Sequence, residues 1–410
     1  MEKQSKQRQD LILFFIAVAV ISLSIGFYEG LLGNYFKDAY HINAFDRGMI
    51  ELPRELPGIL CFILVSLLAF LGDITLAIIA QGLAAIGLFV LGFFTPLYGV
   101  MLVFLFINSM GLHLYMPIRD SIGMALAEPD KIGKRMGQYA GVRFAFMMVA
   151  GVAAFFLFRF EVFSFAHETK WAFVAAAVFA TVAMLILVKL KRDVGQVRRP
   201  RGKFRLLFRK EYKFYYILAI VFGMQKQVML VFGPWVLISM LDQPVDIIVL
   251  LGVISSLIGV FFMPRLGKWI DHFGVKKLLF VDAITFIVIY LAYGVLCHLI
   301  NDSVIAAAGA TVIIVSSLFV LDRLSTQMGM IRTVYLKSIA KKESDIMPTL
   351  SLGLALDHVV SIAMGISGGV IWMTLGAQYI FYIVAALSLV NLFVAIAVKL
   401  PGSLAQQKDA

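Results

Sequence analysis

The stretch KLKRDVGQVRRPRGKFRLLFRKEYK, residues 189–213, divides an otherwise apolar chain into two halves of similar length. It contains eleven Lys and Arg residues and only two acidic residues, Asp193 and Glu211. On either side of it, long apolar segments follow one another with short polar breaks. We therefore expect two similar domains, residues 1–189 and 213–410, joined by a basic linker at residues 190–212.

The composition of the two halves is typical of a protein surrounded by lipid. Hydrophobic residues make up 61% of the chain and charged residues 15%, which would leave a soluble protein with too much exposed apolar surface. A membrane helix needs ~20 mainly apolar residues. We expect an all-α integral membrane protein whose twelve transmembrane helices form two six-helix bundles, at residues 11–33, 48–71, 74–95, 97–119, 137–159, 171–189, 213–240, 245–264, 277–299, 303–327, 347–374 and 376–399.

The distribution of Lys and Arg predicts the orientation of these spans. If both termini are cytoplasmic, the basic strip also lies inside, and only Lys37, Arg47, Arg159 and Lys170 fall outside. Cationic loops are retained on the cytoplasmic side, so the N and C termini and the linker are predicted to be cytoplasmic. The strip has no recognition motif beside it, and we expect no nucleic-acid partner. Short termini and loops favour a bacterial cytoplasmic (inner) membrane.

The two halves carry a weak internal repeat. Ala69-Phe-Leu-Gly-Asp73 closes the predicted second span, and Gly267-Lys-Trp-Ile-Asp271 closes the eighth. Pro117-Ile-Arg119 ends the fourth span and Met330-Ile-Arg332 the tenth. A repeat of six spans is the build of many secondary transporters.

The longest motif, Gly267-Lys-Trp-Ile-Asp271-His-Phe-Gly274-Val-Lys276-Lys277, resembles the cytoplasmic loop signature of the major facilitator superfamily. His272 stands where the family has Arg, and Val275 stands at its first basic position. In the first half only Asp73 and the small residue before it survive. In layout, the resemblance covers essentially the whole chain.

The resemblance implies two bundles that expose a central cavity to each side of the membrane in turn. It also implies a gating motif, in which Asp271 meets the start of the eleventh span and Asp73 that of the fifth. The alternative to a gating role is that this loop only determines the orientation of the neighbouring spans in the membrane. The residues expected in this motif are Asp73, Gly267, Asp271, Gly274, Lys276 and Lys277.

Ionisable side chains inside the apolar spans indicate the functional site, because a charge at mid-bilayer costs ~2.5 kcal/mol or more unless it faces water or a partner. The third, sixth and twelfth spans have none in their interiors, and the resemblance places these on the outside of each bundle. It places the first, fourth, seventh and tenth around the cavity. The expected substrate and coupling residues are Glu29, Arg54, His113, Arg143, Gln225, Lys226, Asp322, Asp357 and His358.

Two interpretations remain open for several of these residues. Lys226 either binds an anionic substrate group or takes part in coupling, or else it forms a structural ion pair with Asp322 or Asp357. Glu29 is the expected proton carrier, because a carboxyl in a low-dielectric cavity can take up a proton, unless Arg54 holds it ionised.

The other ionisable residues are equally undecided. Arg143 and the pair Asp357/His358 occupy matching places in the two halves, and they either pair across the halves or form static pairs within each. A histidine in a polar helix face, His113 or His358, is more often hydrogen-bonded than titrating.

Several chemistries are not expected. The chain has no Gly-rich phosphate loop and no His or Cys metal motif, so we expect no enzyme, cofactor or metal. We expect a monomeric secondary active transporter for a small organic solute, polar or zwitterionic, with protons as coupling ion. One alternative is an efflux pump for amphipathic drugs or lipids. Another is a non-transporting membrane sensor on the same scaffold.

Overall fold

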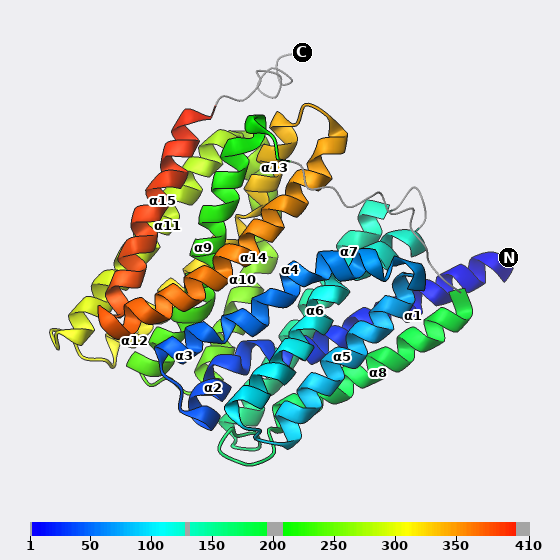
Figure 1. The fold of residues 1–410 in the computed structure, drawn as a ribbon, viewed down its shortest axis with the longest axis horizontal. Helices are drawn as coiled ribbons and strands as arrows, with labels where there is room; N and C mark the ends of the chain where they lie inside the picture. The colour runs from blue at the N-terminus through cyan, green and yellow to red at the C-terminus, as the bar shows by residue number, and fades with distance from the viewer. Residues whose placement is uncertain (1, 128–131, 195–207, 399–410) are drawn as a thin grey trace. The chain divides into compact units, whose positions relative to one another are not determined.

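The computed structural model is all-helical (Figure 1) and describes residues 2–127, 132–194 and 208–398. Most of the predicted linker at 190–212 lies outside these residues. Within them, eleven helical segments are long and apolar enough to cross a membrane. These segments are Gln9–Tyr40, Asp73–Phe93, Tyr98–Leu126, Arg135–Arg159, Trp171–Val194, Lys210–Met240, Val245–Phe273, Val275–Asn301, Ala310–Ile339, Pro348–Thr374 and Ala377–Ala397.

The predicted second span, residues 48–71, accounts for the difference from twelve. The structure has three shorter pieces there, α3 (Ala44–Met49), α4 (Glu51–Leu67) and the 3₁₀ turn η2 (Ala69–Leu71). Helix α4 has 17 residues and contains Pro57, and a proline inside a helix removes one backbone hydrogen bond. The count of twelve spans therefore stays a prediction.

The chain forms two compact units. The first contains residues 1–41, 53–204 and 244–253, and the second contains residues 42–52, 205–243 and 254–410. Each unit thus takes in one short segment from the other half of the sequence. The predicted domain boundaries at 189 and 213 do not include this exchange.

In the first unit, α5 packs against both α6 and α8, and α1 packs against α7 and α8 (Figure 1). Helices α5 and α6 approach closely at Gly111, where an added Cβ would lie 2.4 Å from the carbonyl oxygen of Ala80. The helices of this unit, besides most of α4, are α1 (Glu2–Gly26), η1 (Glu29–Leu31), α2 (Leu32–Tyr40), α5 (Asp73–Phe93), α6 (Tyr98–Leu126), α7 (Ile132–Arg159) and α8 (Trp171–Val194).

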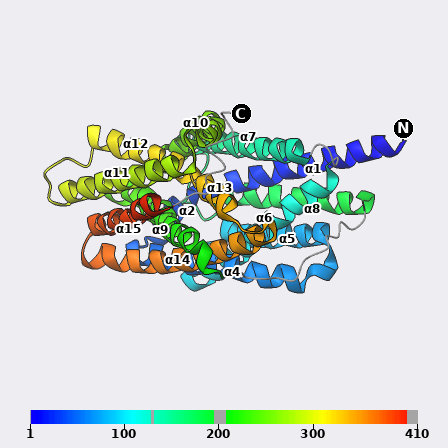
Figure 2. The same ribbon diagram turned by 90° about the horizontal axis from the view of Figure 1, so that it is seen from above.

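In the second unit, α9 packs against α14 and α15, and α11 packs against α15 (Figure 2). Helix α14 also packs against α3. Helix α10 begins in the first unit and continues in the second. The helices are η3 (Lys210–Tyr212), α9 (Lys213–Trp235), the π-helix η4 (Val236–Met240), α10 (Val245–Phe273), α11 (Val275–Asn301), α12 (Ala310–Gln327), α13 (Met330–Ile339), α14 (Glu343–Thr374) and α15 (Ala377–Ala397).

Two predicted spans have different forms in the structure. The first span, expected at 11–33, is interrupted after Gly26 and continues through η1 and α2 to Tyr40. The tenth, expected at 303–327, begins only at Ala310 and continues as α13 after a break at Met328–Gly329. Apolar composition located both segments, but it contains no signal for these local breaks.

Candidate substrate and coupling site

Lys226, on α9, forms an ion pair with Asp357 of α14. Its Nζ donates a hydrogen bond to Oδ2 of the carboxylate. The Lys226 and Asp357 side chains are 26% and 12% exposed. Both helices belong to the second unit. Of the two partners that the sequence left open, Asp357 and Asp322, the structure pairs Lys226 with Asp357.

The second oxygen of Asp357 is not satisfied. Within the described residues, Oδ1 has no hydrogen-bond partner, and neither has Oγ of Ser361, which lies one turn further along α14 and is fully buried. A buried polar atom left without a partner costs ~1–3 kcal/mol. Such unsatisfied groups need an explanation in a native structure, and here they adjoin a partly buried ion pair.

Asp322 lies elsewhere in the same unit. It is 2% exposed on α12. The Tyr290 hydroxyl of α11 lies 3.5 Å from its Oδ1, and the Thr326 hydroxyl lies 3.5 Å from its Oδ2. Both hydroxyls lie closer to a backbone carbonyl: Tyr290 donates to that of Gln225 at 3.1 Å, and Thr326 donates to that of Asp322 at 3.0 Å.

Gln225, the neighbour of Lys226, serves helix packing. Its side chain is fully buried, donates to the Ser388 hydroxyl at 2.7 Å, and accepts from Asn391 at 3.2 Å. Its backbone carbonyl accepts from the Tyr290 hydroxyl at 3.1 Å. Because adjacent residues on a helix point in different directions, Gln225 joins α9 to α15 and α11 while Lys226 turns to α14.

The predicted cavity residues of the first unit include Glu29 and Arg54. Glu29 begins the η1 turn and is exposed. The adjacent Tyr28 is buried and interacts electrostatically with both Glu29 and Arg54. These residues form one polar cluster, but the burial expected for a proton carrier is absent at Glu29 in this conformation.

His113 and Arg143 lie nearby in the same unit. His113 Nδ1 is 2.9 Å from the carbonyl oxygen of Ser109, one turn earlier on α6. The Arg143 guanidinium lies 4.8 Å from the Phe144 ring and interacts electrostatically with Glu29 and Asp120. A pairing of Arg143 across the two halves stays a prediction, as does any coupling role of His358, which is buried beside Asp357 on α14.

The sequence interpretation missed a buried ion pair in the second unit. Arg332 of α13 donates to Asp282 of α11 at 2.7 Å, and the two side chains are 5% and 1% exposed. The guanidinium also lies 3.9 Å from the ring centroid of Phe222 on α9. Each residue stands near the end of a predicted span, where a charge is usually solvated. Their pairing was therefore not evident from sequence position.

A second missed group holds α3 in the second unit. Arg47 and Glu51 form an ion pair of 2.5 Å, and Gln227 of α9 donates to Glu51 at 2.8 Å. All three side chains are buried. Beside them an added Cβ at Gly48 would lie 2.1 Å from the carbonyl oxygen of Gly365 on α14. Glu51 is therefore an interior residue of the second unit and not part of a solvated helix end.

Most residues of the gating motif lie on helices and not in a loop. Gly267 and Asp271 belong to the last turns of α10, and only Gly274 stands between α10 and α11. Gly274 has φ +81° and ψ 155°. Asp271 is exposed, and it forms no hydrogen bond or ion pair within the ranges that the structure describes.

The two basic residues of the motif differ in their surroundings. Lys276 donates to the carbonyl oxygens of Ile396 and Val398 at 3.1 and 2.9 Å. It therefore satisfies carbonyl groups at the end of α15, which have no partner within the helix. Lys277 is exposed.

Asp73 is not equivalent to Asp271. It is the first residue of α5, is buried, and accepts a hydrogen bond from the Ser121 hydroxyl of α6. Gly72 before it has φ +79° and ψ 156°, nearly the conformation of Gly274. The backbone therefore matches Gly72 with Gly274, which places Asp73 at the position of Val275. The contact of Asp73 with the start of the fifth span stays a prediction, since residues 128–131 lie outside the described ranges.

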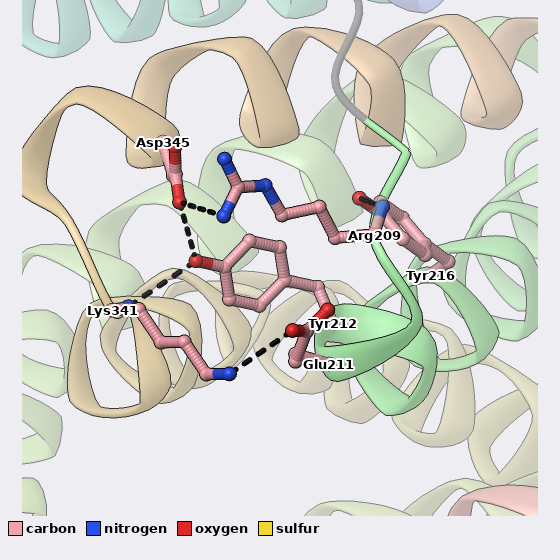
Figure 3. A network of polar contacts seen from close by, with 6 residues as sticks. All are labelled: Arg209, Glu211, Tyr212, Tyr216, Lys341 and Asp345. Atoms are coloured by element: carbon pink, nitrogen blue, oxygen red, sulfur yellow. Dashed lines mark hydrogen bonds and ion pairs between the residues drawn. The ribbon is translucent and has the colours of Figure 1, made fainter.

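A polar network connects the start of α9 to the chain between α13 and α14 (Figure 3). The Tyr212 hydroxyl donates to Asp345 at 2.9 Å and accepts from the backbone N–H of Lys341 at 3.2 Å. Arg209 lies 3.3 Å from Asp345, and Lys341 Nζ donates to Glu211 at 3.0 Å. The C-terminal end of the basic strip is thereby anchored to α14 and to the chain just before it.

Comparisons with known proteins agree with this architecture. The profile described as Major Facilitator Superfamily matches residues 14–342. The chain therefore belongs to the major facilitator superfamily and is a multi-pass integral membrane protein with a transporter fold. No curated protein matches the chain.

Solved structures with the same fold share little sequence with the chain. A variant of the nucleoside transporter NupG is 14% identical, with a TM-score of 0.75 over 95% of this chain and 99% of that one. A bacterial homologue of the iron transporter ferroportin, in the inward-facing state, is 12% identical, with a TM-score of 0.71 over 95% and 98%. A D-xylose-proton symporter is 15% identical, with a TM-score of 0.68 over 94% and 97%. At these identities the likeness establishes the fold alone.

Proposed function

We propose that this protein is a proton-coupled secondary transporter that moves a small polar or zwitterionic organic solute by alternating access. It works as a monomer in a bacterial cytoplasmic membrane, with twelve spans and both termini inside. The solved structures of like fold include a nucleoside transporter and a sugar–proton symporter, which supports transport of a polar solute. The ion pair between Lys226 and Asp357 is the single observation that carries the proposal.

The position of this pair supports a role beyond packing. A charge inside a membrane protein is costly, and it marks substrate or ion pathways by default. Lys226 is one quarter exposed while Asp357 is mostly covered, so an arriving solute meets the ammonium group first. This arrangement differs from the Arg332–Asp282 pair, in which neither side chain is exposed beyond 5%.

The proposed coupling is an exchange of partners. An anionic group of the solute draws the Lys226 ammonium away from Asp357. The carboxylate then lacks its cation in a mostly buried site, where the neutral form is favoured, and it takes up a proton from water. Release of the solute on the other side returns Lys226 to Asp357 and expels the proton, so that one proton crosses with each solute molecule.

The test compares charge removal at each partner in proteoliposomes. Asp357→Asn is expected to retain exchange of solute across the membrane but to lose accumulation driven by a pH gradient, because the amide cannot titrate. Lys226→Ala is expected to lose transport while still inserting and folding. Lys268→Ala, at an exposed lysine of α10, is the control and retains wild-type uptake.

Two further variants separate this proposal from its alternatives. If the pair is only structural, the double variant Lys226→Ala/Asp357→Ala regains wild-type accumulation, because neither charge is left unpaired. Glu29→Gln is expected to keep accumulation under a pH gradient, since Glu29 is exposed. Loss of that accumulation in Glu29→Gln, with Asp357→Asn unaffected, would assign coupling to the first unit and refute the proposal.

A further inference from the structure

We infer that Gly223 is a positioning residue for the coupling pair: by leaving space for Asp357, it keeps the carboxylate in contact with Lys226. This inference rests on the proposed function. Gly223 lies three residues before Lys226 on α9, and residues three apart share one face of a helix. It therefore faces α14 together with Lys226.

The contact between Gly223 and Asp357 is close. A Cβ added at Gly223 would lie 2.7 Å from Asp357 Oδ1 and 3.2 Å from Asp357 Cα. It would also lie 2.7 Å from Cγ2 of Val360, a β-branched side chain with little rotamer freedom in a helix. Any side chain at position 223 therefore moves Asp357 or separates α9 from α14.

This packing explains the unsatisfied oxygen of Asp357. Oδ2 accepts from Lys226, whereas Oδ1 lies against the α9 backbone at Gly223 and has no hydrogen bond among the described residues. With Oδ1 unbonded, the ionised form of Asp357 depends mainly on Lys226. Departure of Lys226 then leaves the carboxylate without its hydrogen-bonded cation, which is the condition that the proposed coupling requires.

Other titratable groups near Asp357 do not replace Lys226. Tyr215 of α9 and Arg332 of α13 interact electrostatically with the carboxylate, and His358 is its neighbour on α14. Arg332 hydrogen-bonds to Asp282. Among the groups that the structure describes, Lys226 makes the direct contact, and the position of Asp357 relative to it controls the charge state.

The experiment measures the pH profile of solute accumulation by Gly223→Ala in proteoliposomes. The methyl group displaces Asp357 and weakens its contact with Lys226, on which the proposed coupling depends. We expect the pH profile of accumulation to shift relative to wild type, with a smaller effect on KM than on kcat.

The matched control is Gly368→Ala. A Cβ there would lie 2.4 Å from the Phe232 ring of α9, so it disturbs the same α9–α14 contact without touching the pair. Gly368→Ala is expected to lower stability while leaving the pH profile unchanged. If both variants shift the profile equally, the effect belongs to helix packing and the inference is wrong.

A second variant tests the inference in case Gly223→Ala folds poorly. Combining it with Val360→Ala removes the clash with Val360 and keeps the clash with Oδ1, so the same shift is expected. An unchanged profile in either variant overturns the inference. If Asp357→Asn loses coupling in that case, the proposed function still stands. If Asp357→Asn keeps coupling, the proposed function fails independently.

Discussion

At the scale of single residues, two ion pairs in the second unit differ in exposure and therefore in expected role. Lys226–Asp357 is partly open, whereas Arg332–Asp282 is closed off from solvent. Arg332 Nε, Arg332 Nη1 and Asp282 Oδ1 have no hydrogen bond among the described residues. A fully buried ion pair with unsatisfied polar atoms contributes little net stability to the fold. Removal of one partner nevertheless lowers the stability strongly, because the other charge is left buried and unpaired.

Asp282→Leu is accordingly expected to destabilise the protein by about 3 kcal/mol, because it leaves the Arg332 guanidinium buried and unpaired. The double variant Asp282→Leu/Arg332→Met is expected to recover most of this loss. Thermal unfolding of the purified protein in detergent measures both. A surface control, Arg265→Met on α10, should remain within about 0.5 kcal/mol of wild type. Equal losses in the single and double variants would show that the loss does not arise from the unpaired Arg332 guanidinium.

The sequence predicted the importance of Lys226 and narrowed its partner to two aspartates. It could not choose between them, because this choice depends on how α9 and α14 pack. Gln225 illustrates the opposite case: it was grouped with Lys226 by adjacency, yet the rotation of about 100° between successive helical residues turns it towards α15. The exposure of Glu29 could not be predicted from the sequence either. Glu29 begins a 3₁₀ turn, and the pattern of apolar residues gives no signal for such a turn.

At the scale of elements, the resemblance located a glycine-containing motif but treated its two glycines as alike. In the structure Gly267 lies inside α10, and an added Cβ would have no atom within 4 Å among the described residues outside the adjoining turns of the helix. Gly274 has a backbone conformation that is essentially restricted to glycine. The periodic apolar signal ended near residue 264, whereas α10 continues through polar residues to Phe273, so the sequence assigned the motif to a loop.

These conformations predict opposite effects of the same substitution. Gly274→Ala is expected to destabilise the protein by about 1–3 kcal/mol, because alanine is strained at that φ and ψ. Gly267→Ala is expected to be neutral or stabilising by up to about 1 kcal/mol, because alanine favours the helix. Unfolding midpoints of the two variants, compared with wild type under the same conditions, provide the measurement. A larger loss for Gly267→Ala than for Gly274→Ala would contradict the assignment.

At the scale of the whole molecule, the sequence predicted two similar halves, and the structure adds that each unit includes a short segment of the other half. These segments are residues 42–52 and 244–253. The number of residues between their starting positions equals the number between Gly72 and Gly274, so the segments occupy matching positions in the two halves of the sequence. Buried contacts hold the first segment in place through Glu51 and Gln227. In the second segment, the buried Asp246 forms an ion pair of 3.7 Å with the exposed Arg159. Apolar segmentation of the sequence could not reveal this exchange, because it arises from packing between distant helices.

Alternating access requires contacts that exist in only one state, and Asp271 fits that requirement. It is exposed and forms no hydrogen bond or ion pair within the described residues, so the predicted contact with the start of the eleventh span would belong to another conformation. Asp271→Asn is then expected to favour the state open to the cytoplasm. It should slow turnover several-fold while changing substrate affinity little.

Labelling of a cysteine introduced at Ser338, near the end of α13, measures this shift from the cytoplasmic side. The native Cys61 and Cys297 are buried, which keeps background labelling low. The labelling rate is expected to rise in Asp271→Asn and to stay unchanged in Asp302→Asn, an exposed aspartate that follows α11. A gating residue changes the populations of the two conformations, so its substitution must change the labelling rate. If Asp271→Asn changes turnover but not the labelling rate, Asp271 has no gating role and only helps to set the membrane topology of the loop.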